Sequence, residues 1–185
     1  MMRPILGGND IATYTKVSKA VVSYLLVVWW LVGPLVGFWP VGGTDGNSVG
    51  TIWEHVLWPL SHANVWHLAG NLYFLWVMKG RLNLRECYLV AVVCSFLPVL
   101  PGLWEILPFD DSQGVVATCG FSGVLCAVVG VKWGEWIKSH YSITAYWTFA
   151  KRVLPFVAVG FLIPHVNWSI HLYCLLAGLT YGRHL

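Results

Sequence analysis

The chain has 185 residues, of which 57% are hydrophobic and only 10% are charged, whereas about 25% of the residues of a soluble domain are charged. This composition excludes an ordinary soluble protein and predicts one polytopic membrane domain. The 11 Lys and Arg residues are scattered between apolar runs, which argues against nucleic acid as a partner.

Successive apolar runs predict an all-α membrane protein with six transmembrane helices. The first run, residues 20–39, has about the 20 residues that a bilayer requires, and residues 1–19 form a polar lead that we expect in the cytoplasm. The fifth run, residues 153–163, is short and needs the preceding turn, with Lys151 and Arg152 snorkelling, to cross the bilayer. The other runs are residues 63–78, 86–104, 120–136 and 168–181. We therefore expect a six-helix membrane domain over residues 20–185.

The distribution of charge predicts the orientation of these spans. With six spans both termini lie on one side, and every Lys and Arg then falls at the span ends on that side. The acidic residues that fall on the opposite side are Asp45, Glu54, Glu105, Asp110 and Asp111. Because Lys and Arg mark the cytoplasmic side, we expect cytoplasmic termini. The second, fourth and sixth spans then begin near the outer face.

Polar residues at the start of these three spans are the candidate functional residues. His67 and Asn71 are four residues apart and share a helix face in the second span. Ser122 begins the fourth span and His171 lies in the sixth. Such residues are costly inside a bilayer and often functional, although each alone could equally form a structural hydrogen bond between helices.

Together these residues fit acyl transfer by a serine and a histidine. Ser122 lies between Gly120-Phe121 and Gly123, and His171 could take its proton and later give it to the leaving amine. Asn71 and His67 could donate to the oxyanion beside the N–H of Ser122. The spans hold no Asp or Glu that could orient His171, so we expect a dyad. Gly123 and Gly178 could let the fourth and sixth helices approach closely.

A zinc site is the competing chemistry, because His62, His67 and His171 could supply three ligands. The chain lacks the H-E-x-x-H motif, and zinc would leave the Gly-Phe-Ser-Gly sequence without a role. We therefore expect no metal and no cofactor. His62 is expected in a loop or first turn, where a loop-bracing hydrogen bond is the simpler interpretation. The remaining histidines, His55, His140, His165 and His184, are expected at the interface or in solvent.

Three motifs resemble those of the rhomboid family of intramembrane serine proteases. Residues 61–71 (SHANVWHLAGN) resemble its second-helix signature, with two histidines and an asparagine. Residues 120–123 (GFSG) resemble its GxSG nucleophile motif, and His171 followed by Gly178 resembles its sixth-helix motif. The order and spacing of these motifs match over about residues 20–183. The chain departs from the family pattern at Glu54, Cys126, Ile170 and Cys174.

The resemblance implies a six-helix rhomboid-like bundle of the minimal bacterial form. It implies that Ser122 is the nucleophile, His171 the general base, and His67 and Asn71 parts of the oxyanion hole. The expected partners are the bilayer and transmembrane protein substrates, cleaved near their outer ends from a site that opens to the outer side of a bacterial inner membrane. The alternatives are a pseudoprotease that binds membrane helices and a relative that trims C-terminal anchors. A transporter would show related halves with broken helices, which the sequence lacks.

Overall fold

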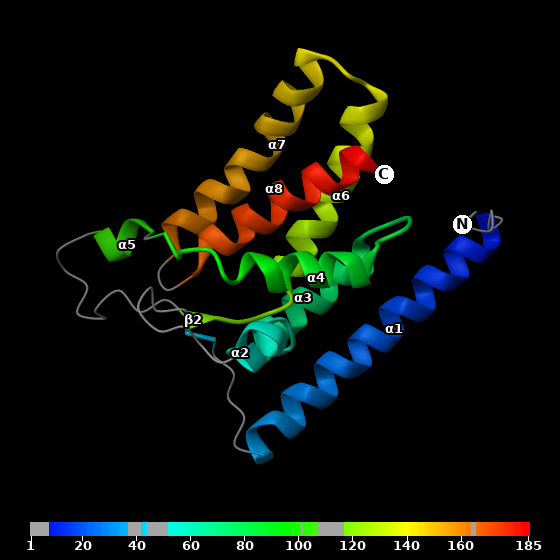
Figure 1. Ribbon diagram of the computed structural model, residues 1–185. Helices are drawn as coiled ribbons and strands as arrows, with labels where there is room; N and C mark the ends of the chain where they lie inside the picture. Colours follow the sequence, from blue (N-terminus) through cyan, green and yellow to red (C-terminus); the bar gives the residue numbers. More distant parts are fainter. Residues whose placement is uncertain (1–7, 37–41, 44–51, 101, 107–116, 164–165) are drawn as a thin grey trace.

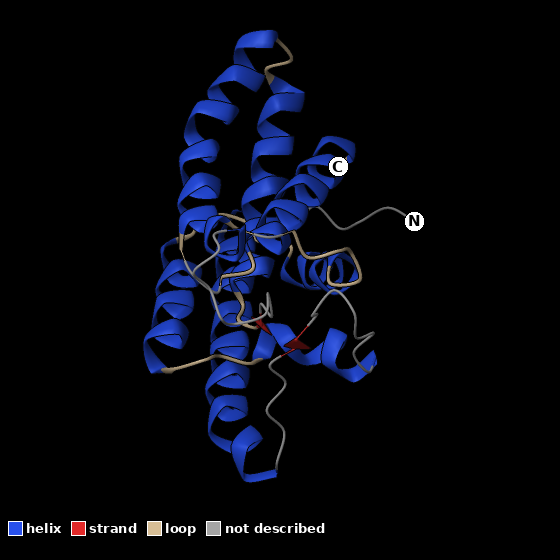
Figure 2. Ribbon diagram, turned by 90° about the vertical axis from the view of Figure 1, so that its left-hand side faces the viewer, coloured by secondary structure: helices blue, strands red, loops and turns tan. Residues whose placement is uncertain are grey.

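A computed structural model describes residues 8–36, 42–43, 52–100, 102–106, 117–163 and 166–185. This part of the chain is almost entirely helical (Figures 1 and 2). The α-helices are α1 (Gly8–Val32), α2 (Ile52–Leu57), α3 (Val65–Val77), α4 (Leu84–Cys94), α5 (Leu103–Ile106), α6 (Ser122–Ser139), α7 (Ile143–Leu162) and α8 (Trp168–His184), with 3-10 helices η1 (Gly33–Val36) and η2 (Trp58–Leu60). Strands β1 (Gly42–Gly43) and β2 (Ala117–Thr118) form one antiparallel pair. The predicted all-α class is therefore correct apart from this short pair.

Each predicted span contains a helix, but some boundaries differ. α1 begins at Gly8, within the predicted polar lead. α4 ends at Cys94, well before the predicted end at residue 104, because the prolines that follow cannot continue a helix. α7 has 20 residues and begins at Ile143, where the Ser142 hydroxyl accepts the Ala145 N–H. The helix α7 is therefore much longer than the apolar run, residues 153–163, that predicted the fifth span.

The length of each helix bears on the membrane topology. Among the described residues, only the segment Ala12–Val32 of α1 is both long and apolar enough to cross a bilayer by itself. The helix α3 has 13 residues and α4 has 11, fewer than the roughly 20 that a straight span requires. The count of six spans therefore stays a prediction.

The helices α6 and α8 pack backbone against backbone. A Cβ atom added at Gly178 would collide with the backbone oxygen of Ala127, and one added at Gly182 would collide with that of Val131. Gly130 and Gly134 of α6 meet the backbone of α8 in the same way. Glycines spaced by four residues on both helices thus allow a contact that any side chain would prevent. This pair forms the centre of the structure (Figure 1).

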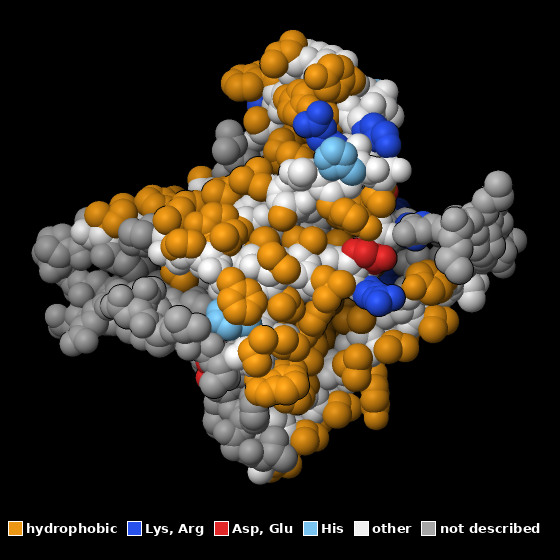
Figure 3. Space-filling view, viewed as in Figure 1, with side chains coloured by type: hydrophobic (Ala, Val, Ile, Leu, Met, Phe, Trp, Pro, Cys, Tyr) orange, Lys and Arg blue, Asp and Glu red, His pale blue; other side chains and the backbone are white. Residues whose placement is uncertain are grey.

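A buried core surrounds this pair, and the outer surface is apolar. Leu75 of α3, Ala91 of α4, Val124 of α6 and Cys174 of α8 are fully buried, as is Leu26 of α1. Apolar side chains also cover much of the exterior (Figure 3). A soluble monomer rarely exposes so much apolar surface, whereas a bilayer would cover it.

Candidate active site

The structure brings Ser122 and His171 into hydrogen-bond contact. Ser122 is the first residue of α6, and His171 lies in the first turn of α8. The Oγ atom of Ser122 lies 2.7 Å from Nε2 of His171, although the two residues are 49 positions apart in the sequence. A nucleophile and a general base require a separation of about 2.6 to 3.2 Å. The pair therefore has the geometry for proton transfer.

A network at the start of α8 holds His171 in place. Asn167 is the N-cap, and its side-chain oxygen accepts the Ile170 N–H at 3.1 Å and the Ser169 hydroxyl at 2.7 Å. The amide nitrogen of Asn167 donates to the Thr118 hydroxyl at 2.6 Å. The sequence-based predictions did not include this network, although asparagine before an apolar run is a recognised N-cap signal. The first turn of α8 is thus fixed to the segment that leads to Ser122.

Gly120 brings the backbone before Ser122 against α3. Its φ of +104° suits glycine alone, and its N–H donates to the Trp58 carbonyl at 3.1 Å. A Cβ atom at this position would overlap the His67 ring and lie 3.3 Å from Nδ2 of Asn71. Glycine is therefore required here for both its conformation and its size. His67, Asn71 and residues 120–122 consequently meet at one place.

Asn71 carries a hydrogen-bond donor with no partner in the described structure. The residue is 5% exposed, and its Nδ2 atom is fully buried and unpaired among the described residues. An unpaired buried donor costs roughly 1 to 3 kcal/mol and calls for an explanation. Asn71 lies one helical turn after His67, beside Gly120. The unpaired donor thus lies next to residues 120–122.

His62 braces the same segment from the loop before α3. Its Nδ1 atom lies 3.1 Å from the Leu60 carbonyl, which can only accept, so Nδ1 carries the proton. The Nε2 atom then accepts the Phe121 N–H at 3.4 Å. Burial, with a smaller contribution from neighbouring His67, lowers the pKa of His62 to about 4. The ring is therefore neutral at pH 7, as these two hydrogen bonds require.

Two expectations for other residues need correction. Gly123 does not receive the backbone of α8, because a Cβ atom there would collide with the Trp58 indole and lie 3.4 Å from the Cys174 sulfur. Only Gly178 of the predicted pair has the expected helix contact. Trp58 itself is 1% exposed. Gly123 thus makes room for the Trp58 side chain beside Ser122.

His55 is buried, not interfacial or solvated as predicted. Its Nδ1 atom lies 2.9 Å from the Ser95 hydroxyl, and its ring stacks on Phe96 with centroids 3.9 Å apart. The Tyr88 hydroxyl also donates to the Val56 carbonyl. The prediction failed because α2 folds against α4 and so removes this histidine from solvent.

The zinc hypothesis finds no support in the geometry. Both ring nitrogens of His62 already form hydrogen bonds to the backbone, and Nε2 of His171 is hydrogen-bonded to Oγ of Ser122. The described residues include no group of three or more His, Cys, Asp or Glu side chains that could hold a metal ion. His62 and His171 therefore already use these ring nitrogens in hydrogen bonds.

Comparison with known proteins gives one family assignment. The family model of the Rhomboid domain matches residues 49–185, which include α2 to α8 and every residue of the site described above. None of the curated proteins compared with the chain matches it.

Proposed function

Because the chain belongs to the rhomboid family of integral membrane proteins, we propose that it is an intramembrane serine endopeptidase that cleaves transmembrane substrate helices. The observation that carries this proposal is the 2.7 Å contact between Ser122 Oγ and His171 Nε2. A serine is a weak nucleophile unless a base can take its proton. A neutral histidine within hydrogen-bond reach supplies that base.

The reaction follows from these two groups. His171 takes the proton of Ser122 as Oγ attacks the carbonyl carbon of the scissile peptide bond, and a tetrahedral intermediate forms. The protonated His171 gives the proton to the leaving amine as the C–N bond breaks, which leaves an acyl-enzyme. His171 then deprotonates a water molecule that attacks the carbonyl carbon of this ester. The bond from the acyl carbon to Ser122 Oγ breaks, the carboxylic acid product leaves, and protonated His171 returns the proton to Ser122.

Three donors are proposed to stabilise the oxyanion. The N–H of Ser122 is in the first turn of α6, where backbone donors have no partner within the helix. The buried Nδ2 of Asn71 is unpaired among the described residues, and the His67 ring lies against Gly120. A donor of this kind lowers the barrier by about 3 to 4 kcal/mol. The unpaired amide of Asn71 thus gains a partner only when the intermediate forms.

The site is proposed to operate as a dyad. Within the described residues, Nδ1 of His171 has no hydrogen-bond partner, and no carboxylate contacts the ring. The Asn167 network fixes the helix that carries His171, so orientation comes from the backbone. A third catalytic side chain is not needed in this arrangement.

The proposed topology places both termini in the cytoplasm. Lys19 of α1 donates to the carbonyls of Trp76 and Met78 at the end of α3, the first of them at 3.0 Å. Lys132 donates to the carbonyls of Lys79 and Arg81. Lysines thus gather at the side that the positive-inside rule assigns to the cytoplasm. Ser122 and His171 start their helices at the opposite side, so cleavage would occur near the outer end of a substrate in a bacterial inner membrane.

Purified protein incubated with a panel of single-span substrates tests this function. The wild type is expected to yield two fragments by mass spectrometry, and Ser122→Ala is expected to yield none. Ser139→Ala, which removes an exposed hydroxyl at the other end of α6, is the matched control and should cleave normally. Intact substrates that nevertheless co-purify with the wild type would favour the pseudoprotease alternative.

A further inference from the structure

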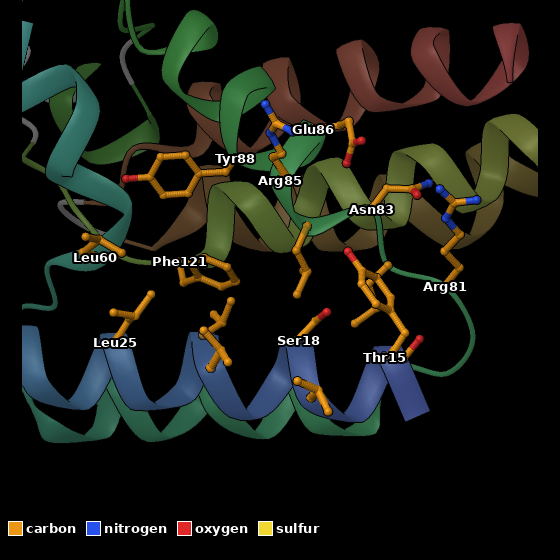
Figure 4. Close-up of a pocket in the computed structure, with 16 residues that line it drawn as sticks. Thr15, Ser18, Leu25, Leu60, Arg81, Asn83, Arg85, Glu86, Tyr88 and Phe121 are labelled. Carbon is orange, nitrogen blue, oxygen red and sulfur yellow. The ribbon is translucent and has the colours of Figure 1, made fainter. Parts of the chain in front are cut away.

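A pocket lies between α1 and the start of α4, and neither Ser122 nor His171 lines it. Its volume is about 490 Å³, within the roughly 300 to 1,000 Å³ typical of sites for small molecules. The helix α1 forms one wall and residues 81–88 form the opposite wall (Figure 4).

The two ends of the pocket differ in chemistry. Arg81 and Asn83 lie beside Thr15 at one end, whereas Leu25, Leu60 and Phe121 lie toward the other (Figure 4). The apolar end has no charged side chain in its lining. A ligand that fits both ends must therefore join a polar head to an apolar tail.

The charge at the polar end favours an anion. Arg81 and Arg85 are both exposed, and among the described residues neither guanidinium group forms a hydrogen bond or an ion pair. Arg81 lies at the polar end, whereas Arg85 and the acidic Glu86 lie further along the lining, toward Tyr88 (Figure 4). Lys132 adds a further positive charge nearby, because its ammonium group binds the carbonyls of Lys79 and Arg81. One guanidinium group can donate two parallel N–H···O hydrogen bonds to the oxygens of a phosphate.

Asn83 gives independent evidence that the polar end is specialised. Its φ of 44° and ψ of 43° are left-handed, which is unusual for a residue other than glycine. It precedes α4 as the N-cap, yet its side chain forms no capping hydrogen bond. Strained backbone of this kind is often retained for ligand contacts. The amide is therefore positioned at the pocket and free of the usual capping role.

We propose that this pocket binds one anionic glycerophospholipid. Arg81 would contact the phosphate, Arg85 would add positive charge nearby, and an acyl chain would lie along α1 toward Leu60 and Phe121. In the topology proposed above, the loop of residues 79–83 faces the cytoplasm, where anionic headgroups attract basic residues near the membrane. A lipid in the bilayer would then have its headgroup at the polar end of the pocket and its acyl chains at the apolar end. The proposal does not depend on whether the protein is a protease.

Lipid titration of the purified protein tests the headgroup contact. Protein in an uncharged detergent is titrated with dioleoyl phosphatidylglycerol or dioleoyl phosphatidylcholine, and bound lipid is counted by native mass spectrometry. Each arginine near a headgroup contributes about fivefold to the affinity, so the wild type is expected to prefer phosphatidylglycerol by at least about tenfold. The Arg81→Gln/Arg85→Gln variant should lose this preference.

A matched charge control separates a pocket from general surface attraction. Lys138→Gln/Lys151→Gln removes two positive charges outside the pocket and should keep the preference. Equal binding of both lipids by the wild type, or loss of the preference in this control, would overturn the proposal.

A second pair of variants tests the acyl-chain end. Val21→Trp fills the pocket from α1 and is expected to weaken binding of both lipids, whereas Leu31→Trp, on the same helix but outside the lining, should not. Unchanged binding in folded Val21→Trp would contradict the proposal. Glycerol 3-phosphate in excess should leave phosphatidylglycerol bound, because it lacks the acyl chains. Displacement by this soluble anion would instead identify a free phosphate site.

Discussion

Gly178 of α8 lies directly against the backbone oxygen of Ala127 of α6, so that no side chain fits between them. Ala127 follows Ser122 by five residues, and Gly178 follows His171 by seven. This contact therefore sets the distance between α6 and α8 close to Ser122 and His171. The separation of Ser122 and His171 depends on this glycine as much as on the two side chains themselves.

Gly178→Ala is expected to reduce reactivity without altering a reacting group. The added methyl group collides with Ala127, and misplacement by about 1 Å can cost on the order of 100-fold in rate. The rate of fluorophosphonate labelling measures the effect. Gly70→Ala in α3 is the matched control, because nothing lies within 4 Å of a Cβ atom there. Equal labelling of both variants would show that close helix packing does not position the pair.

Removal of either proposed oxyanion donor is expected to lower the activity of the protein but not its stability. Asn71→Ala and His67→Ala are each expected to slow cleavage on the order of ten- to a thousandfold. Removal of the buried Nδ2 of Asn71, unpaired in the described structure, should leave the melting temperature unchanged or raised, because it relieves an unsatisfied group. Cleavage rates and thermal melts of the same preparations measure both effects. Parallel loss of both quantities would favour a structural hydrogen bond.

The lowered pKa of His62 predicts that the stability of the folded protein depends on pH. Its pKa in the folded protein is about 4, against 6.5 for an unperturbed histidine, so the unfolded state binds the proton more tightly. The stabilisation that depends on the neutral His62 ring is therefore fully present above pH 6.5, and it is lost progressively as the pH falls from 6.5 toward 4. Thermal melts across this range should show a smaller decline for His62→Gln than for the wild type. The exposed His140→Gln should decline as the wild type does; an unchanged decline in His62→Gln would refute this assignment.

The topology predicts opposite accessibility of two connections. A cysteine introduced at Lys138, at the end of α6, should react with a membrane-impermeant maleimide only after cell lysis. A cysteine at Asp111, which lies outside the described residues, should react in spheroplasts. The five native cysteines are replaced by serine in the background protein. Labelling of both positions from the same side would exclude six spans.

Apolar runs and polar spacing made the helices and the candidate pair predictable. The extent of α7 was not, because Lys151 and Arg152 interrupt the apolar run although the helix continues through them. Glycines four residues apart on α6 and α8 are visible in the sequence, but their pairing across helices is a tertiary feature. The same holds for Trp58 beside Gly123 and for Asn167 beside Thr118. Local sequence specifies each helix, whereas the contacts between helices depend on packing.

The most direct measurement of the central claim is the site and rate of labelling by a fluorophosphonate probe, which reacts only with an activated serine. The proposed dyad predicts modification at Ser122 alone, no modification of Ser122→Ala, and a steep fall in His171→Ala, because the 2.7 Å proton acceptor is lost. His140→Ala, which removes an exposed histidine, should label as the wild type does. Full labelling of folded His171→Ala would contradict the assignment of His171 as the base.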